Sequence, residues 1–114
     1  MNFPDFMKNF PLLDIPFPKE VVEAHAIRSD NGLVVFFDFH QDVELPAHSH
    51  EGQWGTCFEG EVELTIDGRT HSYGPGETWN IPSGVVHSAR IKAGTKAMDV
   101  FEEPDRYPVQ DQKQ

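Results

Sequence analysis

Hydrophobic and polar residues alternate along most of the chain between positions 20 and 101. In the segment 61–66 every second residue is apolar, which predicts a strand with one buried and one solvated face. The segment 33–39 carries a similar row of Leu, Val and Phe at alternate positions. This pattern predicts strands over the ranges Val21–Arg28, Leu33–His40, Gln53–Phe58, Glu61–Ile66, Arg69–Tyr73, Glu77–Ile81, Val85–Lys92 and Lys96–Phe101.

Short turn sequences separate these strands. Asp30-Asn31-Gly32 and Asp67-Gly68 are typical of tight hairpin turns, and no segment has the pattern of a helix of useful length. The fold class is therefore expected to be all-β, as a closed barrel or a sandwich. A length of 114 residues predicts a single domain, with an extended, proline-rich N-terminal arm over 1–18, a barrel over about 20–101 and a polar tail over 102–114.

Composition excludes several classes of function. Nine Lys and Arg stand against 19 Asp and Glu, so the net charge of −10 would repel a phosphate backbone, and nucleic acid is not an expected partner. The single cysteine, Cys57, has no partner in the chain for a disulfide. The chain has neither a basic, apolar secretory signal nor an apolar run near the ~18 residues that span a membrane, so we expect a cytoplasmic protein without membrane contact.

Two histidines, His48 and His50, lie two positions apart. On an extended segment both side chains point to the same face and can share a metal ion, although His-x-His alone is weak evidence for a site. The surrounding spacing strengthens the case. Two residues separate His50 from Gln53, and six separate Gln53 from Gly60. Downstream, five, one and two residues separate in turn Gly76, Pro82, Gly84 and His87.

These two blocks resemble the paired signatures of the cupin superfamily, roughly Gly-x5-His-x-His-x3-4-Glu-x6-Gly and Gly-x5-Pro-x-Gly-x2-His-x3-Asn. The second block departs only at its last position, where Ile91 replaces Asn. In the first block Asp42 replaces the leading Gly, Gln53 replaces Glu, and the loop after His50 is one residue shorter. The resemblance covers about residues 40–101 and implies a small RmlC-like cupin with a double-stranded β-helix, or jelly-roll, barrel.

The same residues fit one divalent metal ion. Zn, Fe, Mn and Ni all accept imidazole nitrogen, and His48, His50 and His87 with one oxygen ligand would leave a coordination position open. Gln53 either supplies that oxygen or hydrogen-bonds a metal-bound water. As a ligand, its neutral amide would leave the charge of the ion uncompensated, which favours an anionic ligand or substrate and a strong Lewis acid.

Two further residues are candidates because of their strand positions. Asp99 lies in an apolar strand and faces the cavity if His87 does, so it is either a general acid-base group or a partner of the backbone or of Arg90. Cys57 shares the inward strand face of Gln53. It is either a small buried filler or a thiol close to the metal and substrate.

The segment from Asp99 to Tyr107 is similar to the closing segment of the small pectin-degradation cupins, which ketonise 4,5-unsaturated uronates. That likeness implies that Asp99 is the general acid-base, Phe101 a cavity wall and Arg106 a substrate-binding residue. Arg106 lies one residue later than the family spacing places it, and Glu103 replaces a proline.

Three functions follow as hypotheses. The first is a metal-dependent isomerase or lyase that acts on a small anionic sugar or keto acid by Lewis-acid polarisation and proton transfer. The second is a non-catalytic cupin that binds or senses a small ligand, and the third is an Fe-dependent dioxygenase.

A homodimer is expected, because cupins commonly pair and the Phe-rich arm provides apolar surface for a partner.

Overall fold

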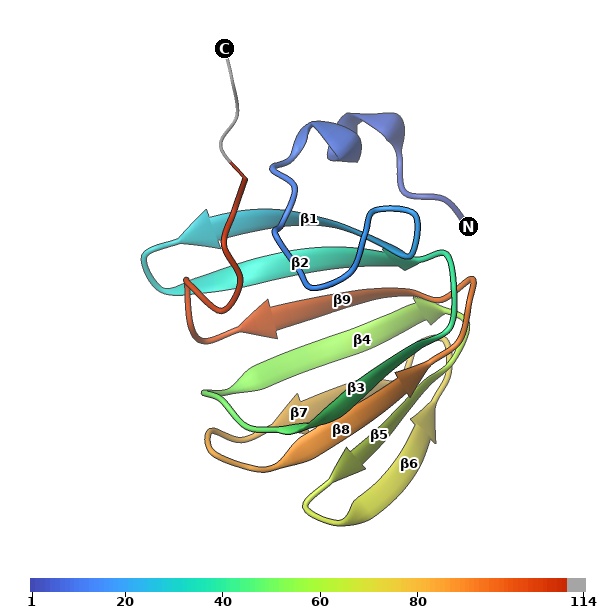
Figure 1. Ribbon diagram of the computed structural model, residues 1–114, viewed down its shortest axis with the longest axis vertical. Helices are drawn as coiled ribbons and strands as arrows, with labels where there is room; N and C mark the ends of the chain where they lie inside the picture. The colour runs from blue at the N-terminus through green and yellow to red at the C-terminus, as the bar shows by residue number, and fades with distance from the viewer. Residues whose placement is uncertain (111–114) are drawn as a thin grey trace.

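Two antiparallel sheets form the body of the protein, as Figure 1 shows for the computed structural model, which describes residues 1–110. One sheet has the strand order β1-β2-β9-β4-β7 and the other β3-β8-β5-β6. The elements are η1 (Asp5–Asn9), β1 (Val22–Ser29), β2 (Gly32–Phe39), β3 (Val43–His48), β4 (Gln53–Glu59), β5 (Val62–Ile66), β6 (Arg69–Tyr73), β7 (Thr78–Ile81), β8 (His87–Ile91) and β9 (Lys96–Phe101). The arrangement is the expected jelly-roll barrel.

The alternation in the sequence decides which side chains fill the barrel. In β2 the residues 33, 35, 37 and 39 are buried, and each intervening residue is partly exposed. The β5–β6 hairpin turns through Asp67 and Gly68, both with positive φ, as a two-residue turn between twisted strands requires. Apolar side chains from both sheets meet between them to form the core: Leu33, Val35, Phe37, Phe39, Val43, Val62, Leu64, Trp79, Ile81, Ala89, Ile91 and Phe101.

Strand β3 was not predicted from the sequence. Among the described strands it pairs only with β8, and its register shifts between Leu45 and His48, where Pro46 interrupts the ladder. Proline cannot donate a ladder hydrogen bond and is tolerated at such an edge or irregularity. Pro46 and the polar neighbours of β3 therefore conceal the strand in the sequence.

The N-terminal arm is not extended throughout, contrary to the prediction. Residues Asp5–Asn9 form a 3₁₀ helix after Pro4, whose carbonyl accepts the Met7 N–H at 3.0 Å. Leu12 then bridges to His25 of β1, and Leu13 bridges to Val109 of the tail. The arm thus packs on its own barrel, beside β1. Of the predicted tail 102–114, residues 111–114 lie outside the described part of the chain.

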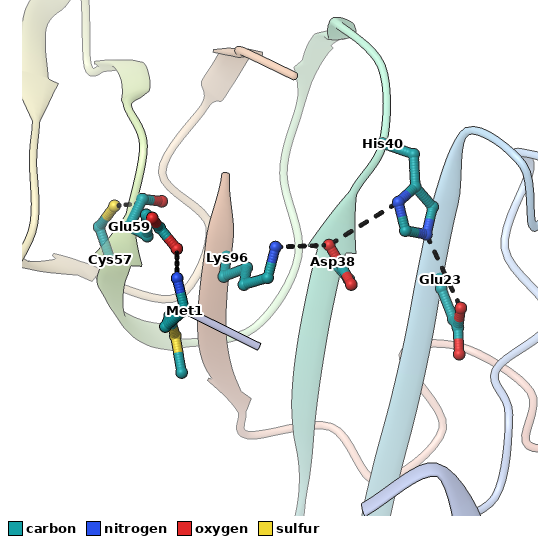
Figure 2. Close-up of polar contacts among 7 residues, drawn as sticks. All are labelled: Met1, Glu23, Asp38, His40, Cys57, Glu59 and Lys96. Atoms are coloured by element: carbon teal, nitrogen blue, oxygen red, sulfur yellow. Dashed lines mark hydrogen bonds and ion pairs between the residues drawn. The ribbon is translucent and has the colours of Figure 1, made fainter. Parts of the chain in front are cut away.

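A row of charged residues crosses the outer face of the five-stranded sheet (Figure 2). Glu23 pairs in register with Asp38, Asp38 with Lys96, and Lys96 with Glu59. Lys96 Nζ lies 3.2 Å from Asp38 Oδ1, and the amino group of Met1 forms an ion pair with Glu59. The positive groups in this row are therefore already paired within the chain.

Within residues 1–110, no helix has the length and apolar character needed to cross a membrane.

Candidate metal centre and cavity

Three histidines converge where β3 ends and β8 begins. His48 is the last residue of β3 and pairs in register with His87, the first residue of β8, while His50 follows in the next loop. The ring centroids lie 4.3 Å apart for His48 and His87, 4.8 Å for His50 and His87, and 5.3 Å for His48 and His50. One ring nitrogen from each residue lies within 4.8 Å of the others, so the three could hold a metal ion.

The protonation of the three rings fits metal binding. Each Nδ1 lies beside a nearby main-chain carbonyl: His48 at Pro46 (2.8 Å), His50 at Glu51 (2.6 Å) and His87 at Val85 (2.9 Å). A carbonyl only accepts, so Nδ1 carries the proton and the lone pair is on Nε2. Nε2 of His50 and of His87 is buried and has no hydrogen-bond partner among the described residues. Burial also lowers the pKa of both rings and so favours the neutral form that binds metals.

Gln53 and Asp99 line the same cavity as the three histidines and are joined by a hydrogen bond. Gln53 Nε2 donates to Asp99 Oδ1 at 2.9 Å. A carboxylate accepts hydrogen bonds, so Asp99 fixes which way the amide points. The Gln53 amide nitrogen is occupied and its carbonyl oxygen remains, which is the atom that a metal ion would take.

Asp99 does not contact Arg90, which was one alternative raised by the sequence. Arg90 lies on the other sheet and pairs with Glu44 at 3.5 Å. Asp99 instead accepts a second hydrogen bond at Oδ1 from Trp79 Nε1, at 2.8 Å. Burial raises the pKa of Asp99 to about 6, although the hydrogen bonds from Gln53 and Trp79 act in the opposite direction. A carboxyl with that pKa can both accept and release a proton near neutrality.

Gly55 leaves the space in which Asp99 and Trp79 meet. It pairs in register with Asp99 on one side and with Trp79 on the other. A Cβ atom on Gly55 would lie 2.1 Å from Asp99 Oδ1 and 2.3 Å from Trp79 Nε1. The roles of Gly55 and Trp79 were not predicted from the sequence. A glycine inside a strand was the available signal, since it often marks a close approach.

The histidines, Gln53 and Asp99 open into a cavity of about 80 Å³ inside the barrel. Phe101 forms part of its wall, with its ring centroid 5.8 Å from that of His50 and 5.7 Å from that of Tyr107. Most of the remaining wall is apolar and includes three residues of the arm: Ile15, Pro16 and Phe17. The arm is therefore part of the cavity wall, which the sequence did not indicate.

Arg106 and Tyr107 follow β9 in the closing segment, and their side chains are in contact. Tyr107 lines the cavity, whereas Arg106 stacks over the Tyr107 ring with its guanidinium carbon 4.4 Å from the ring centroid. Arg106 Nε is buried without a hydrogen-bond partner in the described residues. Burial is the main cause of the lowered pKa of His50 and His87, and the charge of Arg106 lowers both further. Arg106 thus supplies positive charge close to the histidine cluster.

Cys57 is separate from this site. It is almost fully buried and is not among the described residues that line the cavity. Its thiol donates to the carbonyl of Glu59 at 3.4 Å, and burial raises its pKa. A protonated, enclosed thiol has the properties of a packing residue.

Two consecutive glutamates attach the closing segment to the loop that follows His50. Glu103 Oε1 accepts the N–H of Glu51 at 2.8 Å, and Glu102 Oε1 accepts the N–H of Gly52 at 2.9 Å. The Glu102 N–H also donates to the Gly52 carbonyl, at 2.9 Å. The loop between His50 and Gln53 is therefore held by the segment that carries Arg106 and Tyr107.

The fold and the histidine spacing together define a jelly-roll protein with a possible metal site. The family model described as a cupin domain matches residues 35–102, and the chain belongs to the cupin family. No curated protein matches the chain.

Solved structures show the same fold at low identity. An RmlC-like cupin from Shewanella frigidimarina has a TM-score of 0.74 at 22% identity, over 93% of this chain and 94% of that one. KdgF from Halomonas sp. has a TM-score of 0.68 at 19% identity, over 87% of each chain. Bacillus subtilis oxalate decarboxylase, in a structure concerned with its Mn(II) centres, has a TM-score of 0.62 at 24% identity, over 74% of this chain and 26% of that one.

Proposed function

We propose that this cupin binds one divalent metal ion and acts on a small anionic sugar or keto acid by Lewis-acid polarisation and proton transfer, as an isomerase or lyase. Within that class, the ketonisation of 4,5-unsaturated uronates is the reaction we would test first. The observation that carries the proposal is the buried carboxylate of Asp99, which lines the same cavity as the three histidines and is hydrogen-bonded to Gln53. The likeness of segment 99–107 to the pectin-degradation cupins and the structural similarity to KdgF support it.

In this proposal the ligands are His48, His50, His87 and the carbonyl oxygen of Gln53. The bound ion, Zn, Fe, Mn or Ni, would supply a Lewis acid that polarises a substrate oxygen. Four neutral ligands leave its charge uncompensated, which favours an anionic substrate. The positive charge of Arg106 beside the cluster acts in the same direction, and Phe101 limits the space for the substrate.

Asp99 is the proposed acid-base group. Both of its hydrogen bonds in the structure use Oδ1, so Oδ2 is the oxygen assigned to proton transfer. In a ketonisation, Oδ2 would accept the hydroxyl proton of an enol and return a proton to the adjacent carbon. The number of electrons in the substrate does not change, so the reaction needs neither an oxidant nor a reductant. Trp79 and Gln53 would keep the carboxylate in place during this exchange.

The first experiment measures metal per chain in protein purified without a histidine tag. We expect about one equivalent in the wild type and in His71→Ala, which removes an exposed histidine outside the cluster, and almost none in a His48→Ala, His87→Ala variant. If the wild type neither carries a metal nor takes up Fe, Mn, Ni or Zn, the metal-dependent function is wrong. The element found also separates Lewis-acid chemistry from the Fe-dependent dioxygenase.

The second experiment assays the metal-loaded protein with unsaturated uronates. Asp99→Asn should retain the metal and lose about a hundredfold or more in rate, because Asn cannot take the proton. If the variant binds the ligand normally and no turnover is found in either protein, the non-catalytic binding cupin becomes the better interpretation. A cytoplasmic location and a homodimeric state remain part of the proposal.

A further inference from the structure

The cavity inside the barrel is polar at one end and apolar at the other. His87, at the start of β8, pairs in register with His48, whereas Ile91, at the end of β8, pairs with Val43 and Val62. All five side chains line the cavity. At about 3.3 Å per residue, the length of β8 places the two ends of this wall roughly 13 Å apart. A ligand in the cavity therefore meets the histidines at one end and aliphatic side chains at the other.

The five-stranded sheet shows the same order. Gln53 pairs in register with Phe101, whose ring lies beside the histidines. Asp99 lies two positions before Phe101 in β9, and Ala97, two positions further back, pairs with Phe37. Beyond Asp99 this wall is apolar. In the described part of the chain, the polar side chains that line the cavity are His48, His50, Gln53, His87, Asp99 and Tyr107.

Several of these polar atoms are already occupied within the chain. The amide N–H of Gln53 and the indole N–H of Trp79 both donate to Asp99 Oδ1, at 2.9 Å and 2.8 Å. The Nδ1 atoms of the three histidines face main-chain carbonyls. A ligand hydroxyl group placed against the apolar part of the wall would lose its hydrogen bonds to water without a replacement, which opposes binding. The wall thus selects against a ligand with hydroxyl groups along its whole length.

The N-terminal arm contributes Phe17 to the apolar end of the cavity. The next residue, Pro18, accepts the main-chain N–H of Val22 at 3.1 Å, and Val22 begins β1 and pairs with Phe39. Phe17, Val22 and Phe39 all line the cavity. Phe17 is half-buried, packs against the core and belongs to no strand. A substitution at this position therefore changes the cavity without interrupting a sheet.

The volume of the cavity limits the size of the ligand. The cavity has about 80 Å³, and a water-sized group needs about 10–15 Å³, so roughly five to eight non-hydrogen atoms fit. When the charged and polar groups of the ligand lie at the histidine end, its remaining atoms must form an apolar side chain. A carboxylate next to a keto group meets this requirement, because all of its oxygens lie at one end of the molecule.

We propose that the ligand of this cavity is a short 2-oxo acid with an apolar side chain, and that Phe17 limits the length of that side chain. The inference rests on the function proposed above and narrows its substrate class from sugar acids and keto acids to apolar keto acids. The carboxylate and keto oxygens lie at the histidine end, and the side chain extends past Asp99 toward Ala97 and Ile91. A sugar acid carries hydroxyl groups in that part of the cavity and binds more weakly.

The first test compares two acids of equal size by isothermal titration calorimetry on metal-loaded protein, with the metal content measured in the same sample. 2-Oxobutanoate ends in a methyl group where hydroxypyruvate carries a hydroxyl group, and the two molecules have the same number of non-hydrogen atoms. We expect 2-oxobutanoate to bind about 10–100-fold more tightly, because the wall offers that hydroxyl group no partner. This comparison uses only the wild type, so it does not depend on the folding of a variant.

The second test replaces Phe17 with alanine and adds 4-methyl-2-oxopentanoate, a longer apolar acid. In Phe17→Ala the affinity for this acid relative to 2-oxobutanoate should rise about tenfold or more above the wild-type ratio, because the cavity gains room for the added carbons. Phe6→Ala is the matched control, since Phe6 lies in the same arm, is 64% exposed and is not among the described residues that line the cavity. Its ratio should equal that of the wild type.

A metal-loaded wild type that binds hydroxypyruvate as tightly as 2-oxobutanoate, or that binds neither acid, would overturn the ligand class. An unchanged ratio in a Phe17→Ala protein that still binds 2-oxobutanoate would overturn the role of Phe17. Failure of the proposed function gives a different result. A metal-loaded protein that ranks the acids as expected, but turns over neither keto acids nor uronates, supports this inference and makes the non-catalytic binding cupin the better interpretation.

Discussion

The indole N–H of Trp79 donates a hydrogen bond to Asp99 Oδ1 at 2.8 Å, and this bond passes across the strand between them. Trp79 lies in β7 and Asp99 in β9, while β4 separates the two strands and contributes Gly55 at the crossing. Since Gln53 of β4 donates to the same oxygen, three strands fix one carboxylate. The position of Asp99 therefore depends on the register of the whole sheet and not on its neighbours in sequence.

Replacing Gly55 with alanine should break this arrangement. The new Cβ would lie 2.1 Å from Asp99 Oδ1 and 2.3 Å from Trp79 Nε1, so at least one side chain must move. Overpacking of this kind costs about 1–3 kcal/mol in the free energy of unfolding, and urea denaturation measures it. Gly74→Ala is the control, because its nearest neighbour would be 3.7 Å away. If Gly55→Ala and Gly74→Ala are equally stable, Asp99 and Trp79 do not meet over Gly55.

Metal binding should stabilise the fold through the histidine cluster. A ligand that binds only the folded chain adds about 2.7 kcal/mol at a hundredfold excess over its dissociation constant, which corresponds to a rise of several degrees in the unfolding midpoint. We expect this rise in thermal unfolding of the wild type after a chelated sample is reloaded with metal. The His48→Ala, His87→Ala variant lacks two of the three converging rings and should show no rise. A similar rise in both proteins would place metal binding elsewhere on the chain.

Glu103 should act on the metal affinity through the main chain. Its carboxylate accepts the N–H of Glu51, the residue that follows His50 and whose carbonyl faces the Nδ1 of that ring. Supporting contacts of this kind typically contribute 10–100-fold to metal affinity, roughly the loss expected for Glu103→Ala in a metal titration. Glu103→Gln retains an acceptor oxygen and should restore most of the affinity. If Gln behaves like Ala, the charge rather than the hydrogen bond is the important feature.

The barrel was predictable because strands such as β5 alternate apolar and polar residues, and because the turn at Asp67 and Gly68 is local. The prediction failed at β3, where Pro46 and polar neighbours hide an edge strand, and at η1. The clustering of His48, His50 and His87 was predictable from the spacing of the two sequence blocks and their resemblance to the cupin signatures.

The contacts that position Asp99 could not be predicted in the same way. Gly55 and Trp79 meet it only because three separate strands align in one register, which no single segment specifies. Tyr107 and Phe17 reach the cavity because the tail and the arm fold back over the barrel, held by main-chain hydrogen bonds such as Asp14 N–H to the Pro108 carbonyl at 2.8 Å.

The attachment of the arm should weaken at low pH through Glu23. His25 Nε2 lies 2.8 Å from Glu23 Oε2 and its Nδ1 lies 2.8 Å from the Phe10 carbonyl in the arm. Burial alone would raise the pKa of Glu23, but the hydrogen bond from His25, the charges of Lys19 and His25 and the contact with His40 together lower it. A carboxyl whose pKa is lower in the folded state binds fewer protons there than in the unfolded chain. Its stabilising contribution is therefore complete above the unfolded pKa of about 4.3 and is lost as the pH falls through the folded value.

Glu23→Gln should accordingly reduce the free energy of unfolding by about 1.5–3 kcal/mol at neutral pH, the usual contribution of a hydrogen bond to a charged group. The difference from the wild type should begin to shrink as the pH falls below about 4.3 and should be small below the lowered folded pKa of Glu23, because both proteins then carry a neutral side chain at this position. Urea denaturation of both proteins, at neutral pH and at the acidic pH, measures the two differences in the free energy of unfolding. Glu44→Gln is the control, since Glu44 pairs with Arg90 at an exposed position and its loss should cost less than about 1 kcal/mol. A difference between Glu23→Gln and the wild type that is the same at both pH values would mean that the ionised carboxylate does not hold the arm.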